Sequence, residues 1–186
     1  GFLLVDRAGA TFLLRPGNYV DRQMLFYDDF EAVQVARLIA AMRRDGCDLF
    51  LDVGANIGLY SVRVARDGLA ERVVAFEPDP RNRDQLAANL LLNGLSGRVE
   101  VRPEAATETA GPVAFQLFDD GFTGKSRLAE DPAAANGFRV AGRPLDELFD
   151  LRGGRLVVKM DIEGHEPAAL AGMTQLLRKN HTLLQV

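Results

Sequence analysis

The sequence has a single cysteine and no tryptophan, and no apolar run approaches the ~20 residues that a helix needs to span a bilayer. Cys47 can therefore form no intrachain disulfide and no cysteine-rich zinc site, and we expect it to be a small buried apolar residue. Residues 1–5 lack the basic region and the long apolar region of a secretory signal. These absences predict a cytoplasmic protein without a membrane partner.

An excess of positive charge is also lacking. Lysine and arginine number 22 against 26 aspartate and glutamate residues, which gives a net charge of −4. Surfaces that bind nucleic acids through their phosphates are normally basic, so we expect no nucleic-acid partner. The length of 186 residues and the hydrophobic content of 47% are typical of one structural domain with its own core. The sequence does not fix an oligomeric state.

The first 48 residues are predicted to form a hairpin and a helix that together cover the rest as a lid. Two short apolar runs on either side of a turn at Gly9 are typical of a β-hairpin. Asp28 and Asp29 are suitable caps for a helix that runs to about Arg44.

From residue 49 onward, apolar strands alternate with segments of helical periodicity. Strands are predicted at 49–53, 72–76, 98–101, 113–118, 156–160 and 182–186, and helices at 57–66, 79–93 and 167–180. Apolar strands linked by helices indicate an α/β fold with a doubly wound, mostly parallel sheet. A sheet that ended on the last strand would have an apolar edge, so we expect further carboxyl-terminal strands that are missing here.

A glycine-containing turn, Asp52-Val-Gly-Ala-Asn-Ile-Gly58, follows the first of these strands. Gly54 and Gly58 let the backbone turn sharply and approach a ligand, toward which the amides of the next helix point. The dinucleotide fingerprint requires a second glycine where this sequence has Asn56. The Asp52 carboxylate suits a ligand with a cationic group better than a pyrophosphate. We predict a cofactor site here; a purely structural turn is the alternative.

Glu77 ends the second of these strands and is a candidate for binding a ribose. In nucleotide-binding α/β folds, an acid about 20 residues after the glycine turn accepts hydrogen bonds from the ribose hydroxyls. A carboxylate can accept from the 2′ and 3′ hydroxyls together. The alternative is a solvated cap of the helix that Pro80 begins.

Four ionisable residues, Asp161, Glu163, His165 and Glu166, crowd the loop after strand 156–160. This loop would lie beyond the carboxyl end of a parallel strand, where open sheets bind their ligands. A histidine flanked by carboxylates at such a place is a functional candidate. A divalent cation is an alternative ligand, but adjacent residues on one loop rarely all converge on an ion, so no metal is predicted.

Taken together, these segments resemble the FkbM family of S-adenosylmethionine-dependent methyltransferases. The runs Asp52–Gly58, Glu77-Pro78 and Lys159–Glu166 are similar to its three most recognisable segments, and Glu31 matches a weaker family position. The resemblance implies a Rossmann-like class I methyltransferase fold.

The resemblance also implies where S-adenosylmethionine binds. The glycine turn would hold its methionine part, Glu77 its ribose, and Glu104 and Ala105 would border its adenine. The cofactor-binding residues are then Asp52, Gly54, Asn56, Gly58, Glu77, Glu104 and Ala105.

The function that follows is methyl transfer, with a hydroxyl of a sugar or secondary metabolite as the expected acceptor and a nitrogen as the alternative. In-line displacement at a sulfonium carbon depends mainly on alignment. A hydroxyl acceptor also needs a base, for which we choose His165, with Asp161 and Glu163 orienting it or holding the substrate. Glu166 is an alternative cap of the following helix. A nicotinamide-dependent oxidoreductase and a non-catalytic cofactor-binding module are the rival functions.

Overall fold

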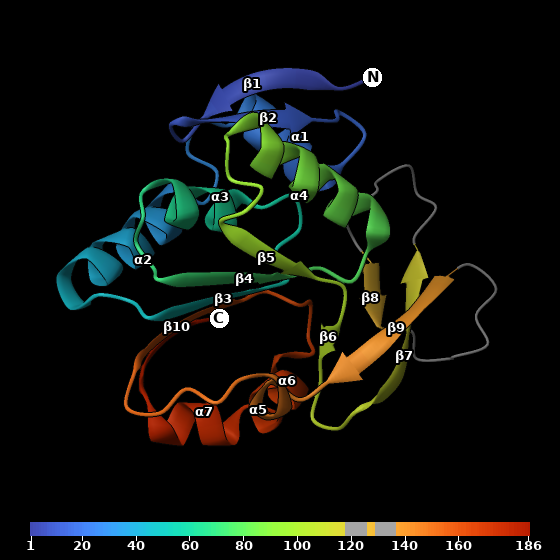
Figure 1. Cartoon of the computed structure of the whole chain (residues 1–186). Helices are drawn as coiled ribbons and strands as arrows, with labels where there is room; N and C mark the ends of the chain where they lie inside the picture. Colours follow the sequence, from blue (N-terminus) through green and yellow to red (C-terminus); the bar gives the residue numbers. More distant parts are fainter. Residues whose placement is uncertain (118–125, 129–136) are drawn as a thin grey trace.

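The computed structural model describes residues 1–117, 126–128 and 137–186, and its centre is a five-stranded sheet (Figure 1). In spatial order the strands are β11 (His181–Gln185), β10 (Arg155–Met160), β3 (Leu49–Val53), β4 (Arg72–Phe76) and β5 (Val99–Arg102). Every neighbouring pair is parallel. The predicted doubly wound α/β fold is confirmed.

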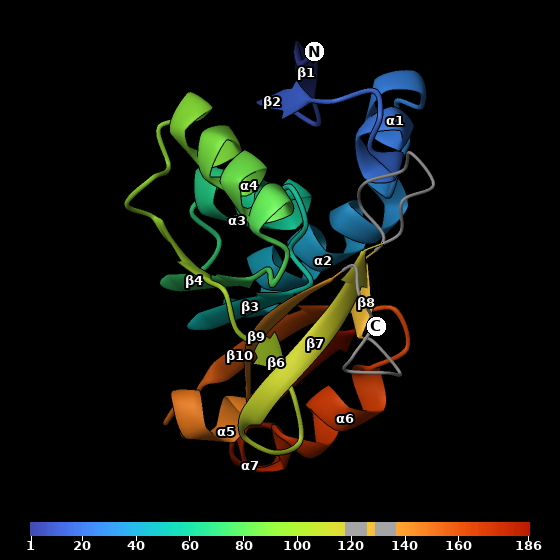
Figure 2. The same cartoon turned by 90° about the vertical axis from the view of Figure 1, so that its right-hand side faces the viewer.

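Helices cover both faces of this sheet. They are α2 (Ala32–Asp45), α3 (Leu59–Arg66), α4 (Pro80–Leu92), α5 (Leu145–Leu148), α6 (Glu166–Ala171) and α7 (Thr174–Lys179). Helices α2, α3 and α4 lie on one face, and α5, α6 and α7 lie on the other (Figures 1 and 2).

Successive strand residues point into two separate cores. Phe50 and Val73 belong to the core beneath α2, α3 and α4, whereas Leu51 and Val74 belong to the core beside α5, α6 and α7. All four are at most 3% exposed. Burial on both faces explains why these strands are continuous apolar runs rather than alternating ones.

The amino-terminal hairpin forms as predicted and packs on α4. Strands β1 (Leu3–Arg7) and β2 (Ala10–Leu14) are antiparallel. The side chain of Asn89 on α4 accepts a hydrogen bond from the amide of Leu13 at 2.7 Å. The predicted lid role of residues 1–48 stays a prediction.

A short helix, α1 (Tyr19–Phe26), follows the hairpin and is absent from the predicted elements. Its cap is Asn18, whose side-chain oxygen accepts from the amides of Val20 and Asp21. Only 8 residues long, α1 is too short to show a clear apolar period in the sequence.

Helix α2 ends where it is predicted to end, but the predicted cap at Asp28 and Asp29 is wrong. The helix begins at Ala32, after Glu31, which has a left-handed backbone and makes no side-chain cap. Asp28 instead pairs with Arg7 of the hairpin at 3.0 Å. Asp28 therefore contacts a residue that is distant in the sequence and does not cap the helix that follows it.

The predicted single helix at 167–180 is also wrong, because it is broken into α6 and α7. A Cβ atom at Gly172 would lie 2.0 Å from the carbonyl oxygen of Thr107, so this close approach requires glycine. Asp146 then caps α7, with Oδ2 accepting from the amide of Gln175 and Oδ1 from that of Leu176.

A second sheet lies beside the carboxyl end of β5 (Figures 1 and 2). Its order is β6 (Ala105–Ala106), β9 (Gly137–Arg143), β7 (Gly111–Leu117) and β8 (Ser126–Leu128). Strand β7 matches the strand predicted at 113–118, whose last residue lies outside the described residues. Within the described ranges, each helix is too short or too polar to cross a lipid bilayer.

Candidate functional site

A cavity of about 230 Å³ lies at the carboxyl ends of β3, β4 and β10. The chain leaves β3 for β4 on one side, while β10 pairs with β3 on the other side. Such a switch in strand order opens a crevice between the loops, which is where open α/β sheets bind ligands.

Most of the site residues predicted from the sequence line this cavity: Gly54, Asn56, Glu77, Glu104, Ala105, Asp161, Glu163 and His165. Asp52 and Gly58 are not among its lining residues. The structure therefore brings the three sequence motifs together at one place.

The glycine turn packs directly against the loop after β10. Gly54 has a φ of +77°, and a Cβ atom there would lie 2.0 Å from the carbonyl oxygen of Asp161. Any side chain at this position would push the two loops apart. Gly54 is therefore the point at which the walls of the cavity contributed by β3 and β10 meet.

Asp52 supports this turn from behind. Its side chain is fully buried, and Oδ2 accepts from the amide and the hydroxyl of Ser61 at 3.1 and 2.6 Å. Lys159 lies 3.7 Å from Oδ1 and donates to the carbonyl oxygen of Gly54 at 2.9 Å. The predicted contact between Asp52 and a cofactor stays a prediction.

Glu77 fixes the turn to the end of β4. Its Oε2 accepts from the amide of Asn56 at 2.7 Å, and its Oε1 accepts from the amide of Asp79 at 2.9 Å. The side chain is 5% exposed, and burial raises its pKa to about 7 although both amide bonds lower it. The side chain of Asn82 donates a third hydrogen bond, and the remaining acceptor position of the carboxylate can accept from a ligand hydroxyl.

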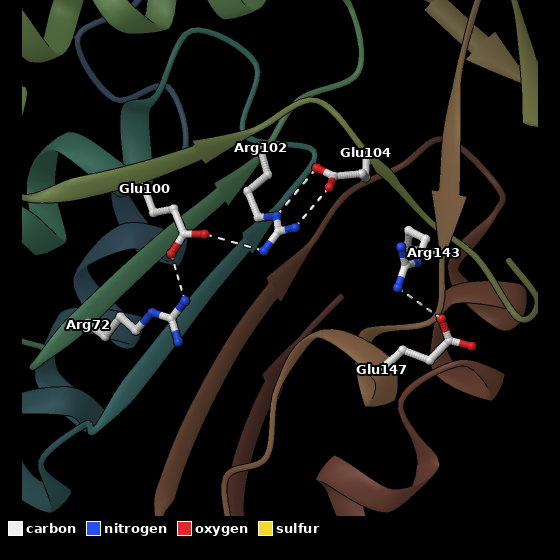
Figure 3. Close-up of polar contacts among 6 residues, drawn as sticks. All are labelled: Arg72, Glu100, Arg102, Glu104, Arg143 and Glu147. Atoms are coloured by element: carbon white, nitrogen blue, oxygen red, sulfur yellow. Dashed lines mark hydrogen bonds and ion pairs between the residues drawn. The ribbon is translucent and has the colours of Figure 1, made fainter.

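Glu104 enters the cavity wall at the end of a chain of ion pairs along the sheet edge, drawn in Figure 3. Arg102 donates to both of its oxygens, at 3.3 and 2.8 Å. This guanidinium group lowers the pKa of Glu104. Arg102 also reaches Glu100, which pairs with Arg72. Glu104 is thus held as a carboxylate.

The acidic loop divides into residues that line the cavity and one that folds the loop. Asp161, Glu163 and His165 line the cavity. Glu166 does not, because its Oε1 accepts from the amides of Ile162 and Gly164 at 3.1 and 3.3 Å. Glu166 therefore shapes the loop from the first turn of α6.

Backbone strain is concentrated around this cavity. In the described part of the chain, the non-glycine residues with positive φ are Ala8, Glu31, Asn56 and Glu163, and all but Ala8 line it. Such conformations cost about 1–3 kcal/mol each and persist at sites where the surroundings enforce them.

The structure adds lining residues that the sequence analysis missed. Tyr19, Phe30 and Glu31 come from the amino-terminal segment, and Tyr60 and Lys159 come from the core. Because alternate residues of a strand share a face, Lys159 lies on the same face as Asp161, and this pattern could have predicted Lys159 as a lining residue. The family resemblance included Glu31 without giving it a role, and no pattern in the sequence pointed to Tyr19, Phe30 or Tyr60. Among the described residues, no group of three His, Cys, Asp or Glu side chains could hold a metal ion.

Comparisons with known proteins agree with this geometry. The family model described as the methyltransferase FkbM domain matches residues 52–186. Hexuronic acid methyltransferase AglP of Haloferax volcanii is 28% identical over 151 residues, which are 75% of this chain and 56% of that protein. Methyltransferase sdnD of Sordaria araneosa is 32% identical over 121 residues, which are 61% of this chain and 43% of that protein. The chain thus spans about half the length of these relatives.

A solved structure supports the fold alone. The tRNA (uracil-54, C5)-methyltransferase of Pyrococcus abyssi, in complex with S-adenosyl-L-homocysteine, matches with a TM-score of 0.50 at 12% identity. The match covers 94% of this chain and 32% of that one.

Proposed function

Because this chain belongs to the FkbM methyltransferase family, we propose that it binds S-adenosylmethionine and methylates a hydroxyl oxygen of a sugar or secondary metabolite. The family match favours methyl transfer over the rival oxidoreductase function. AglP, named for a hexuronic acid, supports a sugar as the acceptor class. A nitrogen acceptor is the alternative within the same chemistry.

The observation on which this proposal chiefly rests is the state of Glu77. Its carboxyl group is buried in the cavity wall and held by two backbone amides and the side chain of Asn82, with acceptor capacity left over. A ribose hydroxyl would donate to this remaining position. The side-chain oxygen of Asn56 is buried and has no hydrogen-bond partner, so it is available to a cofactor amino group on the glycine turn.

The charge of the cavity also fits the cofactor. Among the residues that the structure describes, the acidic ones that line it are Glu31, Glu77, Glu104, Asp161 and Glu163, and the lysine is Lys159. An excess of carboxylates favours a cationic ligand such as a sulfonium compound. Ala105 beside Glu104 leaves room for the adenine on the β5 side.

When bound, S-adenosylmethionine would supply an electrophilic methyl group. The task of the protein is then to align the acceptor oxygen and to remove its proton. His165 would accept that proton on an imidazole nitrogen, and Asp161 and Glu163 would orient the imidazole or hold the acceptor. All three side chains border the cavity, as this role requires.

Calorimetric titration tests the cofactor assignment. We expect S-adenosylhomocysteine to bind and NADH not to bind. Glu77→Ala should weaken S-adenosylhomocysteine binding by about 1–3 kcal/mol, because the ribose hydroxyls lose a charged partner.

The matched control is Asp84→Ala, which removes an exposed acid of α4 outside this cavity and should leave the affinity unchanged. Binding of NADH alone would favour the oxidoreductase. Equal affinity of wild type and Glu77→Ala would remove the ribose assignment.

A further inference from the structure

Glu31 is the acidic group that the amino-terminal segment contributes to the cavity. It lies outside the residues matched by the family model and directly before α2. Its backbone is held in the left-handed region, with a φ of 52°. The side chain caps no helix, so the local structure gives its carboxylate no partner.

The partner of Glu31 comes from the core. Tyr60 of α3 is 4% exposed, and its hydroxyl accepts a hydrogen bond from Nε2 of Gln185 on β11 at 3.1 Å. The phenolic proton is therefore free to point elsewhere, and the Glu31 carboxylate lies near enough to act on the Tyr60 phenol. Burial of Tyr60, followed by hydrogen bonding to Glu31 and the negative charge of Glu31, raises the pKa of the phenol.

One hydrogen bond leaves most acceptor positions of the Glu31 carboxylate unfilled. Two carboxylate oxygens offer about four acceptor positions, and Tyr60 uses one of them. Within the described ranges, the structure shows no ion pair between Glu31 and a lysine, arginine or histidine. Glu31 therefore presents unfilled acceptor positions at the border of the cavity.

The other charged groups that the structure describes at the cavity do not pair with Glu31. Asp161 and Glu163 add two more carboxylates to the same lining. The ammonium group of Lys159 already donates to Gly54 and lies 3.7 Å from Asp52. A negatively charged acceptor would meet uncompensated carboxylates here, whereas a hydroxyl or an ammonium group would gain hydrogen bonds.

We propose that Glu31, held by Tyr60, binds the methyl acceptor and selects one that presents a hydroxyl or protonated amine rather than a carboxylate. This inference rests on the proposed function and narrows its acceptor class to neutral and amino sugars. It separates this chain from the relative that is named for a hexuronic acid.

The test measures binding of three sugar probes to the protein saturated with S-adenosylhomocysteine. The probes are the methyl glycosides of glucose, glucosamine and glucuronic acid, which differ in charge on one scaffold. We expect the first two to bind at least about tenfold more tightly than the glucuronide, in line with hydrogen bonds to a charged group.

Two substitutions separate recognition from general damage. Glu31→Gln should reduce the preference for the amino sugar over the glucuronide by about tenfold or more. Tyr60→Phe should weaken the binding of the neutral and amino sugars less than Glu31→Gln does. In this variant the Glu31 carboxylate remains, but the phenolic hydroxyl no longer positions it. The control Asp29→Asn removes an exposed acid of the same segment and should change nothing.

The outcomes distinguish this inference from the proposed function. Loss of the sugar preference in Glu31→Gln that is saturated with S-adenosylhomocysteine, as the wild type is, supports it. The inference fails if the glucuronide binds best, if none of the probes binds, or if Glu31→Gln behaves as wild type. Failure of the wild-type protein to bind S-adenosylhomocysteine would refute the proposed function instead.

Discussion

At Glu77, burial raises the pKa of the carboxyl group and hydrogen bonds lower it, and burial has the larger effect. Its pKa is raised from 4.5 to about 7. Because the folded state holds this proton more tightly than the unfolded state, the group stabilises the fold below pH 4.5. That contribution is lost as the pH rises through 7.

Cofactor binding should show the reverse dependence on pH. Ribose hydroxyls donate to the ionised carboxylate, so binding favours loss of the proton. We expect the affinity for S-adenosylhomocysteine to rise up to about tenfold per pH unit below 7 and to level off above it. Calorimetry across this range measures the effect. Glu77→Gln should abolish the rise, and a flat wild-type profile would contradict the assignment.

His165 is the residue whose loss should affect turnover without affecting the cofactor. If it accepts the proton of the acceptor hydroxyl, His165→Ala lowers the rate of methyl transfer by about 10²–10⁴-fold. The affinity for S-adenosylhomocysteine should stay the same. The other histidine supplies the control, since His181 is exposed and does not line the cavity. Full activity of His165→Ala would refute its role as the base.

At the scale of elements, the sequence predicted what local pattern and burial determine. The strands of the central sheet are apolar on both faces, so their positions were visible as runs such as 49–53 and 156–160. Asp79 followed by Pro80 marked the start of α4, and the structure has this cap. Local sequence patterns gave the wrong helix boundaries where contact with a distant segment determines the structure. Asp28 pairs with Arg7, and Gly172 packs against Thr107.

The break between α6 and α7 gives a prediction about stability. Gly172→Ala places a Cβ atom against the backbone of Thr107, and such overpacking costs about 1–3 kcal/mol. Thermal or urea unfolding should show this loss. At Gly97 a Cβ atom would meet nothing within 4 Å, so Gly97→Ala is the control. Equal stability of the two variants would mean that the approach at Gly172 relaxes without cost.

At the scale of the whole molecule, the site was predictable to the extent that it lies at strand ends. The turn at Gly54, Glu77 and the loop at His165 each follow a parallel strand, and the ends of such strands meet at one edge. Glu31 and Tyr60 follow no such rule. They reach the cavity through the packing of the amino-terminal segment and α3, which no local pattern encodes.

The contact between Gly54 and the backbone of Asp161 has a thermodynamic consequence. The close approach of Gly54 to Asp161 and the hydrogen bond from Lys159 to Gly54 connect two loops, which the proposed function assigns to the cofactor and to the acceptor. We expect that neither loop can move independently of the other. Binding of the cofactor should then change the affinity for the acceptor. Thermodynamic linkage requires that binding of the acceptor change the affinity for the cofactor by the same factor.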